Sequence, residues 1–298
     1  KEMPGREELE RLTRPGETKI APDNVCAFFY VCICISSISS FMCGFSLGFS
    51  SPTTVASYRA SGVSADAAAC ITYNGTRNVN NSHMLNCELR LSDEMTSWFG
   101  SIINFGCLLG ALSGGPVCDY FGKKLAMIMA LGLYVAGWLC CSLAPSQAFD
   151  TVHGGGVEAT DMATVVWLLL GSRMLIGVGI GLVCTSVSPY QTELAPTNIR
   201  GLVGTSFQIS IVLGLLAAYS MGALVPNWRI LSYLMLGCGV AGLVLTPIVP
   251  ESPVWLVHKG WCEKARTNLL LTRTSSSVDA CEAALEEEAV ACAARGEG

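Results

Sequence analysis

The sequence is poor in charge, and charged residues are absent from several long stretches. Only 14% of its 298 residues are Asp, Glu, Lys or Arg, whereas 51% are hydrophobic, and the mean hydropathy is +0.48. Such values exclude an ordinary soluble domain. The 3 histidines and 15 cysteines show neither a zinc-like spacing nor a Cys-x-x-Cys redox pattern. We therefore expect a membrane protein with no metal and no cofactor.

Six stretches are long and apolar enough to cross a bilayer, whose hydrocarbon core of about 30 Å takes about 20 helical residues. These windows are Val25–Phe49, Met95–Cys118, Leu125–Leu143, Met162–Ser188, Leu202–Leu224 and Ile230–Val249. None shows the period-two alternation of barrel strands, and backbone in lipid must form its hydrogen bonds within its own segment. The predicted fold is an all-α polytopic membrane protein.

The positive residues are distributed unevenly between the two sides of these spans. Most of the 18 Lys and Arg residues fall on the side that holds both termini, which the positive-inside rule makes cytoplasmic. The sequence then divides into a cytoplasmic arm (1–24), a six-span bundle (25–250) and a cytoplasmic helical segment (251–298). Since the chain starts at Lys1 without a cleavable signal, we expect residues upstream and take the first span as the targeting element. The membrane is expected to be the plasma membrane or an internal one.

The outer loop at 51–94 carries candidates for covalent modification. Asn74 and Asn80 each begin an Asn-x-Ser/Thr sequon, so we expect glycosylation there, although such short sequons also arise by chance. Cys70 and Cys87 share the loop and are candidates for a disulfide, because that side of the membrane is oxidising.

One charged residue, Arg173, lies within the spans. On insertion scales an arginine at a helix centre costs about 2.5 to 3.5 kcal/mol. Arg173 is therefore expected to face a partner or a watery cavity. The alternative is that it snorkels to the outer interface from about three turns inside the span.

Two polar turns lie on the predicted cytoplasmic side. Gly115–Lys124 joins a carboxylate, Asp119, to a pair of lysines, and Ser188–Gly201 holds Glu193 and Arg200 around a proline break. These charges are either solvated, contributing about 0 to 1 kcal/mol per pair, or they form a latch between conformations.

The fifth span has a polar residue on an otherwise apolar face. Gln208, Ile211 and Leu215 recur at helical spacing, together with Val212 and Tyr219. A glutamine in lipid would leave its hydrogen bonds unmade, so Gln208 is expected to point into the bundle. It would form an interhelical bond or contact a substrate.

Four segments of the chain together resemble the sugar porter family of the major facilitator superfamily, and the resemblance covers Val25 to about Arg273. The first turn resembles the motif Gly-x-x-x-Asp-x-x-Gly-Arg-Arg/Lys, with lysine in place of the first arginine. The segments are Gly115–Lys124, Arg173–Gly181, Glu193–Gly201 and Pro250–Leu256. Ser97–Gly100 and Gly44–Pro52 look most like the branch of facilitative glucose transporters that holds trehalose and intracellular hexose transporters.

The resemblance implies alternating access, in which two six-helix halves rock about a sugar site at the midplane. Gln208 would bond sugar hydroxyls, and Ile211 and Leu215 would form an apolar wall. The implied partners are a small sugar, the lipid bilayer and a carboxy-terminal six-span half, with no nucleic acid and no enzymatic activity. The implied conformational latch comprises Asp119, Lys123, Lys124, Arg173, Glu193, Arg200 and Glu251.

The sequence departs from the family pattern at three points. Proton-coupled members carry aspartate in Gly-Tyr-Asp-Thr-Gly of the first span, whereas this chain has Ser46, which favours facilitated diffusion. Val254 stands where the family has arginine, and spans seven to twelve are absent. The alternatives are a sugar sensor on a transporter scaffold and a proton-coupled symporter.

Overall fold

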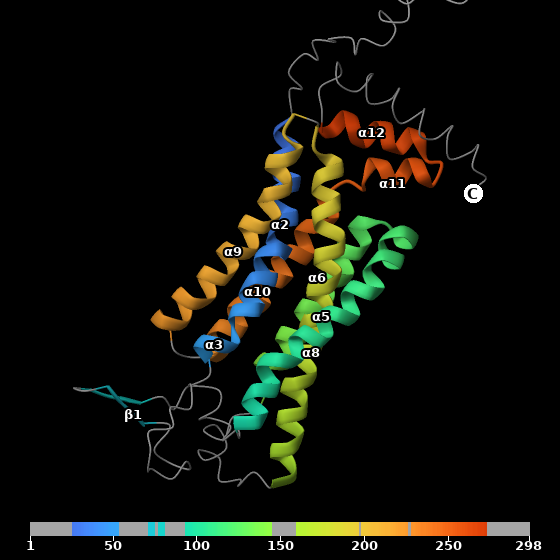
Figure 1. The fold of residues 1–298 in the computed structure, drawn as a ribbon. Coiled ribbons are helices and arrows are strands. Elements are labelled where there is room, and N and C mark those ends of the chain that lie inside the picture. The colour runs from blue at the N-terminus through green and yellow to red at the C-terminus, as the bar shows by residue number, and fades with distance from the viewer. Residues whose placement is uncertain are drawn as a thin grey trace, which may run out of the picture.

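The computed structural model describes residues 26–53, 71–74, 77–80, 93–144, 159–196, 198–225 and 228–272. Six of its helices are long and apolar enough to cross a membrane, and they run side by side as a bundle (Figure 1). These helices are α2 (Ala27–Gly48), α5 (Asp93–Phe121), α6 (Lys123–Ser142), α8 (Ala159–Leu194), α9 (Arg200–Leu224) and α10 (Trp228–Leu245). The six predicted spans are confirmed.

Shorter elements lie at the two ends of the bundle. One end has α3 (Ser50–Thr53) and an antiparallel hairpin of β1 (Ile71–Asn74) and β2 (Arg77–Asn80). The other end has η1 (Thr246–Ile248), α11 (Pro253–His258) and α12 (Cys262–Thr272), the last two lying across the bundle (Figure 1). The predicted helical segment 251–298 is described as far as residue 272, where it holds α11 and α12. Its remaining residues lie outside the described ones, and the hairpin was not predicted.

The turn between α5 and α6 is shorter than the sequence predicts. Helix α5 continues through Pro116 to Phe121 and α6 begins at Lys123, so Gly122 is the only residue between them. Gly122 has φ +91°, a conformation that side chains disfavour. A Cβ at Gly122 would also lie 2.6 Å from a carboxylate oxygen of Glu251. Glycine is therefore required here for both backbone conformation and space.

Helices α5 and α8 pack with their backbones in contact. A Cβ at Gly106 would overlap the carbonyl oxygen of Met174, and one at Gly110 would overlap that of Val178. From the other side, a Cβ at Gly181 would overlap the backbone of α5. The sequence pattern explains this contact, because glycines four residues apart form a continuous small-residue face on a helix.

Helix α2 makes a second close contact, with α9. A Cβ at Gly44 would overlap the carbonyl oxygen of Ile211, and a Cβ at Gly214 would overlap that of Phe41. Helix α8 is largely buried by its neighbours, whereas most of α9 is exposed. The outward side chains of α9 therefore need lipid or another part of the protein to cover them.

Candidate functional site

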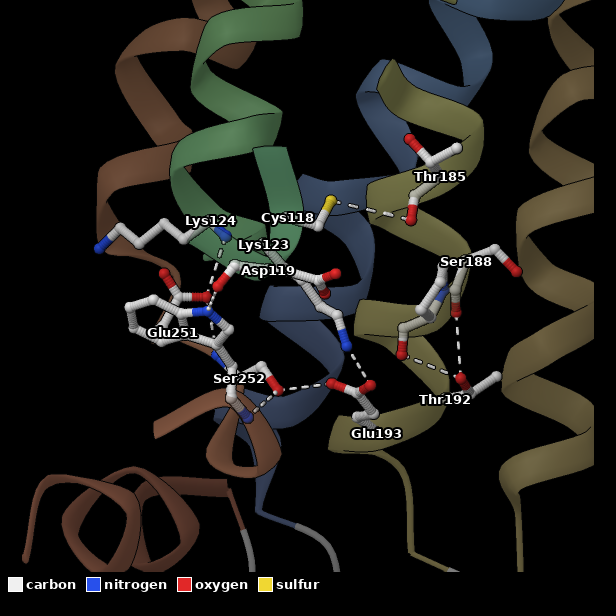
Figure 2. A network of polar contacts seen from close by, with 12 residues as sticks. Cys118, Asp119, Lys123, Lys124, Thr185, Ser188, Thr192, Glu193, Glu251 and Ser252 are labelled. Carbon is white, nitrogen blue, oxygen red and sulfur yellow. Dashed lines mark hydrogen bonds and ion pairs between the residues drawn. The ribbon is translucent and has the colours of Figure 1, made fainter. Parts of the chain in front are cut away.

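A group of polar side chains joins the turn at Gly122, the end of α8 and the segment after α10 (Figure 2). Lys123 forms an ion pair with Oε1 of Glu193, and the hydroxyl of Ser252 donates to Oε2 of the same carboxylate at 2.5 Å. The side chains of Lys123 and Glu193 are only 14% and 23% exposed, so solvent screens the pair incompletely. We call Lys123, Lys124, Glu193, Glu251 and Ser252 the polar cluster.

Glu251 binds the start of α6 within this cluster. Its Oε1 accepts the backbone N–H of Lys124 at 3.0 Å and that of Ser252 at 3.0 Å. A carboxylate at a helix N-terminus satisfies an otherwise unpaired N–H and interacts favourably with the helix dipole. The Lys124 ammonium donates to the carbonyl of Pro247 at 2.7 Å. These contacts tie α6 to the segment that follows α10.

Helix α11 is held over the polar cluster by its first turn. Ser252 is its N-cap, accepting the N–H of Trp255 at 3.4 Å. The Trp255 indole N–H donates to the carbonyl of Asp119 at 3.0 Å, and the Asn268 amide of α12 donates to the carbonyl of Glu251 at 3.0 Å. Both short helices are thereby fixed to the bundle.

The structure brings only some of the predicted latch residues together. Asp119 contributes its backbone carbonyl, and its carboxylate is exposed. Arg200 is exposed and has no ion pair among the described residues. Arg173 lies about 20 residues before Glu193 on α8, on the order of 30 Å away at 1.5 Å per residue. Arg173 is therefore separated from the polar cluster along α8, and its part in the latch stays a prediction.

Arg173 is buried between helices, with 1% of its surface exposed. Its Nη1 donates to the carbonyl of Ser46 at 3.1 Å. The guanidinium carbon lies 4.3 Å from the ring centroid of Phe99 and 4.6 Å from that of Phe49, close enough for cation–π attraction. The snorkelling alternative is wrong, since aromatic rings enclose the cation within the bundle.

The predicted sugar contacts lie on α9. Gln208 is exposed, and its amide has no hydrogen-bond partner among the described side chains of the bundle. Ile211 and Leu215 are half-buried. The backbone of Ile211 packs against Gly44 of α2, and the side chain of Leu215 packs against Gly48. The role of Gln208 as interhelical glue is thus not seen, and its contact with a sugar stays a prediction.

Sequence reasoning missed one buried polar residue, Gln191. Its amide nitrogen donates to the hydroxyls of Ser36 at 2.9 Å and Ser37 at 3.2 Å. Its amide oxygen accepts from the hydroxyl of Ser206 at 3.3 Å. The amide therefore joins α8 to α2 and α9. The serines of the first span, α2, indicate that a neighbouring helix supplies a polar partner.

The outer modification candidates are only partly described. Asn74 and Asn80 are the last residues of β1 and β2, respectively, and their glycosylation stays a prediction. Cys70 and Cys87 lie outside the described residues, so the disulfide also stays a prediction. Among the residues that the structure describes, no three acidic, His or Cys side chains come together as metal ligands.

Comparison with known proteins gives concordant results. The family described as "Sugar (and other) transporter" matches residues 31–293. "Sugar transporter ERD6-like 6" of Arabidopsis thaliana is 31% identical over 245 residues, which cover 81% of this chain and 40% of that protein. "Solute carrier family 2, facilitated glucose transporter member 8" of Mus musculus is 31% identical over 183 residues, covering 61% of this chain and 34% of that protein.

Solved structures with the same fold are transporters of the major facilitator superfamily. The xylose transporter XylE of E. coli, in a partially occluded inward open conformation, matches with a TM-score of 0.65 at 19% identity, covering 91% of this chain and 60% of XylE. The same transporter, described as a proton:xylose symporter and bound to 6-bromo-6-deoxy-D-glucose, matches with a TM-score of 0.69 at 18% identity.

The family match covers residues 31–293, which is nearly all of this chain. The chain itself spans less than half the length of the two curated relatives above. Its six apolar helices agree with a multi-pass integral membrane protein. The chain belongs to the sugar transporter family, with the fold of the major facilitator superfamily.

Proposed function

We propose that this chain is the amino-terminal six-span half of a carrier that moves a hexose or related sugar across a membrane by facilitated diffusion. The observation that carries the mechanism is the contact between Arg173 and Ser46. Arg173 bonds the backbone carbonyl of Ser46, and a serine hydroxyl stands where proton-coupled members of the family carry aspartate. A hydroxyl does not release its proton in the physiological range, so this position cannot carry one through the transport cycle.

The proposed sugar contact is Gln208. Its amide offers both donors and acceptors, which matches the hydroxyl groups of a sugar. Gln208 is exposed on the bundle, and Ile211 and Leu215 follow about one and two turns along α9. We expect the sugar to lie between this side of α9 and a carboxy-terminal six-span half.

The polar cluster is proposed as the latch of the alternating-access cycle. Lys123–Glu193 and the two N–H bonds to Glu251 connect α6, α8 and the segment after α10. A conformational change that separated these elements would break them together. The cluster would therefore favour the state in which its end of the bundle is closed.

The experiment is sugar counterflow in proteoliposomes that contain the full-length protein. Preloading with unlabelled D-glucose should accelerate the entry of labelled D-glucose, and uptake should saturate. Gln208→Leu should lower uptake severalfold, whereas Leu213→Ala, an exposed position on the same helix, serves as the control. Sugar binding without counterflow would replace the proposal by a sensor, and the absence of both would refute sugar recognition.

A further inference from the structure

The surroundings of Arg173 contain buried hydrogen-bond donors that the described protein atoms do not satisfy. Only Nη1 of Arg173 is bonded, to the carbonyl of Ser46, while Nε and Nη2 are buried without a partner. The indole nitrogen of Trp138 is likewise buried without a partner. Both side chains are fully enclosed, with Arg173 1% and Trp138 0% exposed. Buried polar groups in proteins are nearly always paired, so three such donors require an explanation.

The two side chains that carry these donors are neighbours at a point where four helices meet. The guanidinium carbon of Arg173 lies 6.0 Å from the ring centroid of Trp138, 4.3 Å from that of Phe99 and 4.6 Å from that of Phe49. Phe49 and Trp138 also pack edge to face at 4.9 Å. The rings attract the cation through their faces but offer no hydrogen-bond acceptor. The two free guanidinium nitrogens therefore need an acceptor from elsewhere.

The chemistry of the region identifies the kind of acceptor. Arg173 forms no ion pair with a carboxylate among the described residues, and all three unpaired atoms are donors. A guanidinium keeps its charge, and a buried charge without a counter-charge is strongly unfavourable. A water molecule would satisfy two of the donors and leave the charge uncompensated. A monovalent anion accepts several hydrogen bonds and neutralises the cation.

We infer that Arg173 and Trp138 bind a small monovalent inorganic anion, with chloride as the physiological candidate. The anion takes hydrogen bonds from Nε and Nη2 of Arg173 and from the Trp138 indole. It supplies the negative charge that no described side chain supplies, and it joins α6 to α8 beside Ser46 of α2. This inference is independent of sugar transport, because it concerns the charge balance of the bundle.

The first test is the thermal unfolding of the detergent-purified chain in chloride or gluconate at constant ionic strength. Chloride should raise the unfolding temperature, and the rise should saturate with concentration, because a ligand that binds the native state stabilises it by mass action. Arg200→Gln removes an exposed arginine and should leave this dependence unchanged. Equal unfolding temperatures in the two salts, for the wild type, would overturn the inference.

The second test uses bromide as a chloride substitute that quenches tryptophan fluorescence on contact. The fluorescence of Trp138 is the part of the wild-type emission that is lost in Trp138→Phe. Bromide should quench this part in the wild type, and the quenching should saturate as the bromide concentration rises. The same substitution should weaken the chloride affinity about tenfold, the factor for one hydrogen bond to a charged group. Quenching of that component that increases linearly with bromide would overturn the inference.

A third variant distinguishes an anion site from a general salt effect and keeps Arg173 intact. Ser46→Asp introduces a carboxylate at the residue whose backbone carbonyl already accepts from Nη1 of Arg173. The new carboxylate should displace the anion, so that the unfolding temperature no longer depends on chloride. A folded Ser46→Asp protein that keeps the full chloride dependence would contradict an anion at Arg173.

Discussion

Replacing Glu193 by alanine would test the polar cluster most sharply. The substitution removes the partner of Lys123 and the acceptor of the Ser252 hydroxyl in one step. It leaves the Lys123 ammonium, on a side chain that is only 14% exposed, without a counter-charge. Nothing in the described structure near Lys123 offers a second carboxylate at ion-pair distance. The destabilisation should therefore exceed that of an ordinary surface pair.

The burial of the pair sets the size of the effect. Exposed pairs contribute about 0 to 1 kcal/mol, whereas breaking a fully buried pair costs about 3 to 5 kcal/mol. The Lys123–Glu193 pair is partly buried, so the cost of breaking it lies between these limits. The substitution also removes the hydrogen bond from the Ser252 hydroxyl to the Glu193 carboxylate. We expect Glu193→Ala to lower the free energy of unfolding by about 2 kcal/mol. Glu193→Gln should cost less, because its amide oxygen can still accept from Ser252.

A double-mutant cycle with Lys123→Met measures the pair itself, using unfolding in detergent followed by helical circular dichroism. The coupling energy should be about 1 to 2 kcal/mol and should persist at high salt, since screening is weak for partly buried charges. Arg200→Ala, an exposed arginine without an ion pair in the described structure, should change stability by less than about 0.5 kcal/mol. A coupling energy near zero would refute the claim that this pair holds the two elements together.

Three further substitutions follow from the geometry. Gly122→Ala should lower the free energy of unfolding by about 1 to 2 kcal/mol, measured by urea titration, because φ is +91° and Glu251 fills the space beside it; an unchanged midpoint would contradict this. Gln191→Leu should cost about 1 to 3 kcal/mol in the same assay, since three hydrogen bonds between helices are lost. Gln208→Leu should leave the unfolding temperature unchanged while lowering sugar counterflow, and a large loss of stability would instead assign it a structural role.

The spans, the glycine contacts and the family were predictable from the sequence. Each depends on a local or periodic property: apolar length, small residues four apart, or a contiguous motif. Gly106 and Gly110 show this, because their spacing alone places them on one face, and the structure packs that face against α8.

The arrangement of the polar residues was less predictable, because it depends on contacts between distant segments. Glu251 and Lys124 are 127 positions apart, and their bond involves a backbone N–H that no motif reveals. Gln191 was read as part of the turn Ser188–Gly201, but α8 continues through Pro189 to Leu194 and buries the amide. Arg173 was grouped with the charges of the polar turns through motif membership, whereas its position along α8 places it far from them.

The most direct test of the proposed carrier is to record sugar uptake and lumenal pH together in proteoliposomes of the full-length protein. A pH-sensitive dye inside the vesicles reports proton entry, while labelled D-glucose reports transport. We predict saturable uptake that stops at equal concentrations, with no change in lumenal pH and no response to an imposed proton gradient. Accumulation of sugar driven by that gradient, with acidification of the lumen, would contradict facilitated diffusion through a site that has Ser46 beside Arg173.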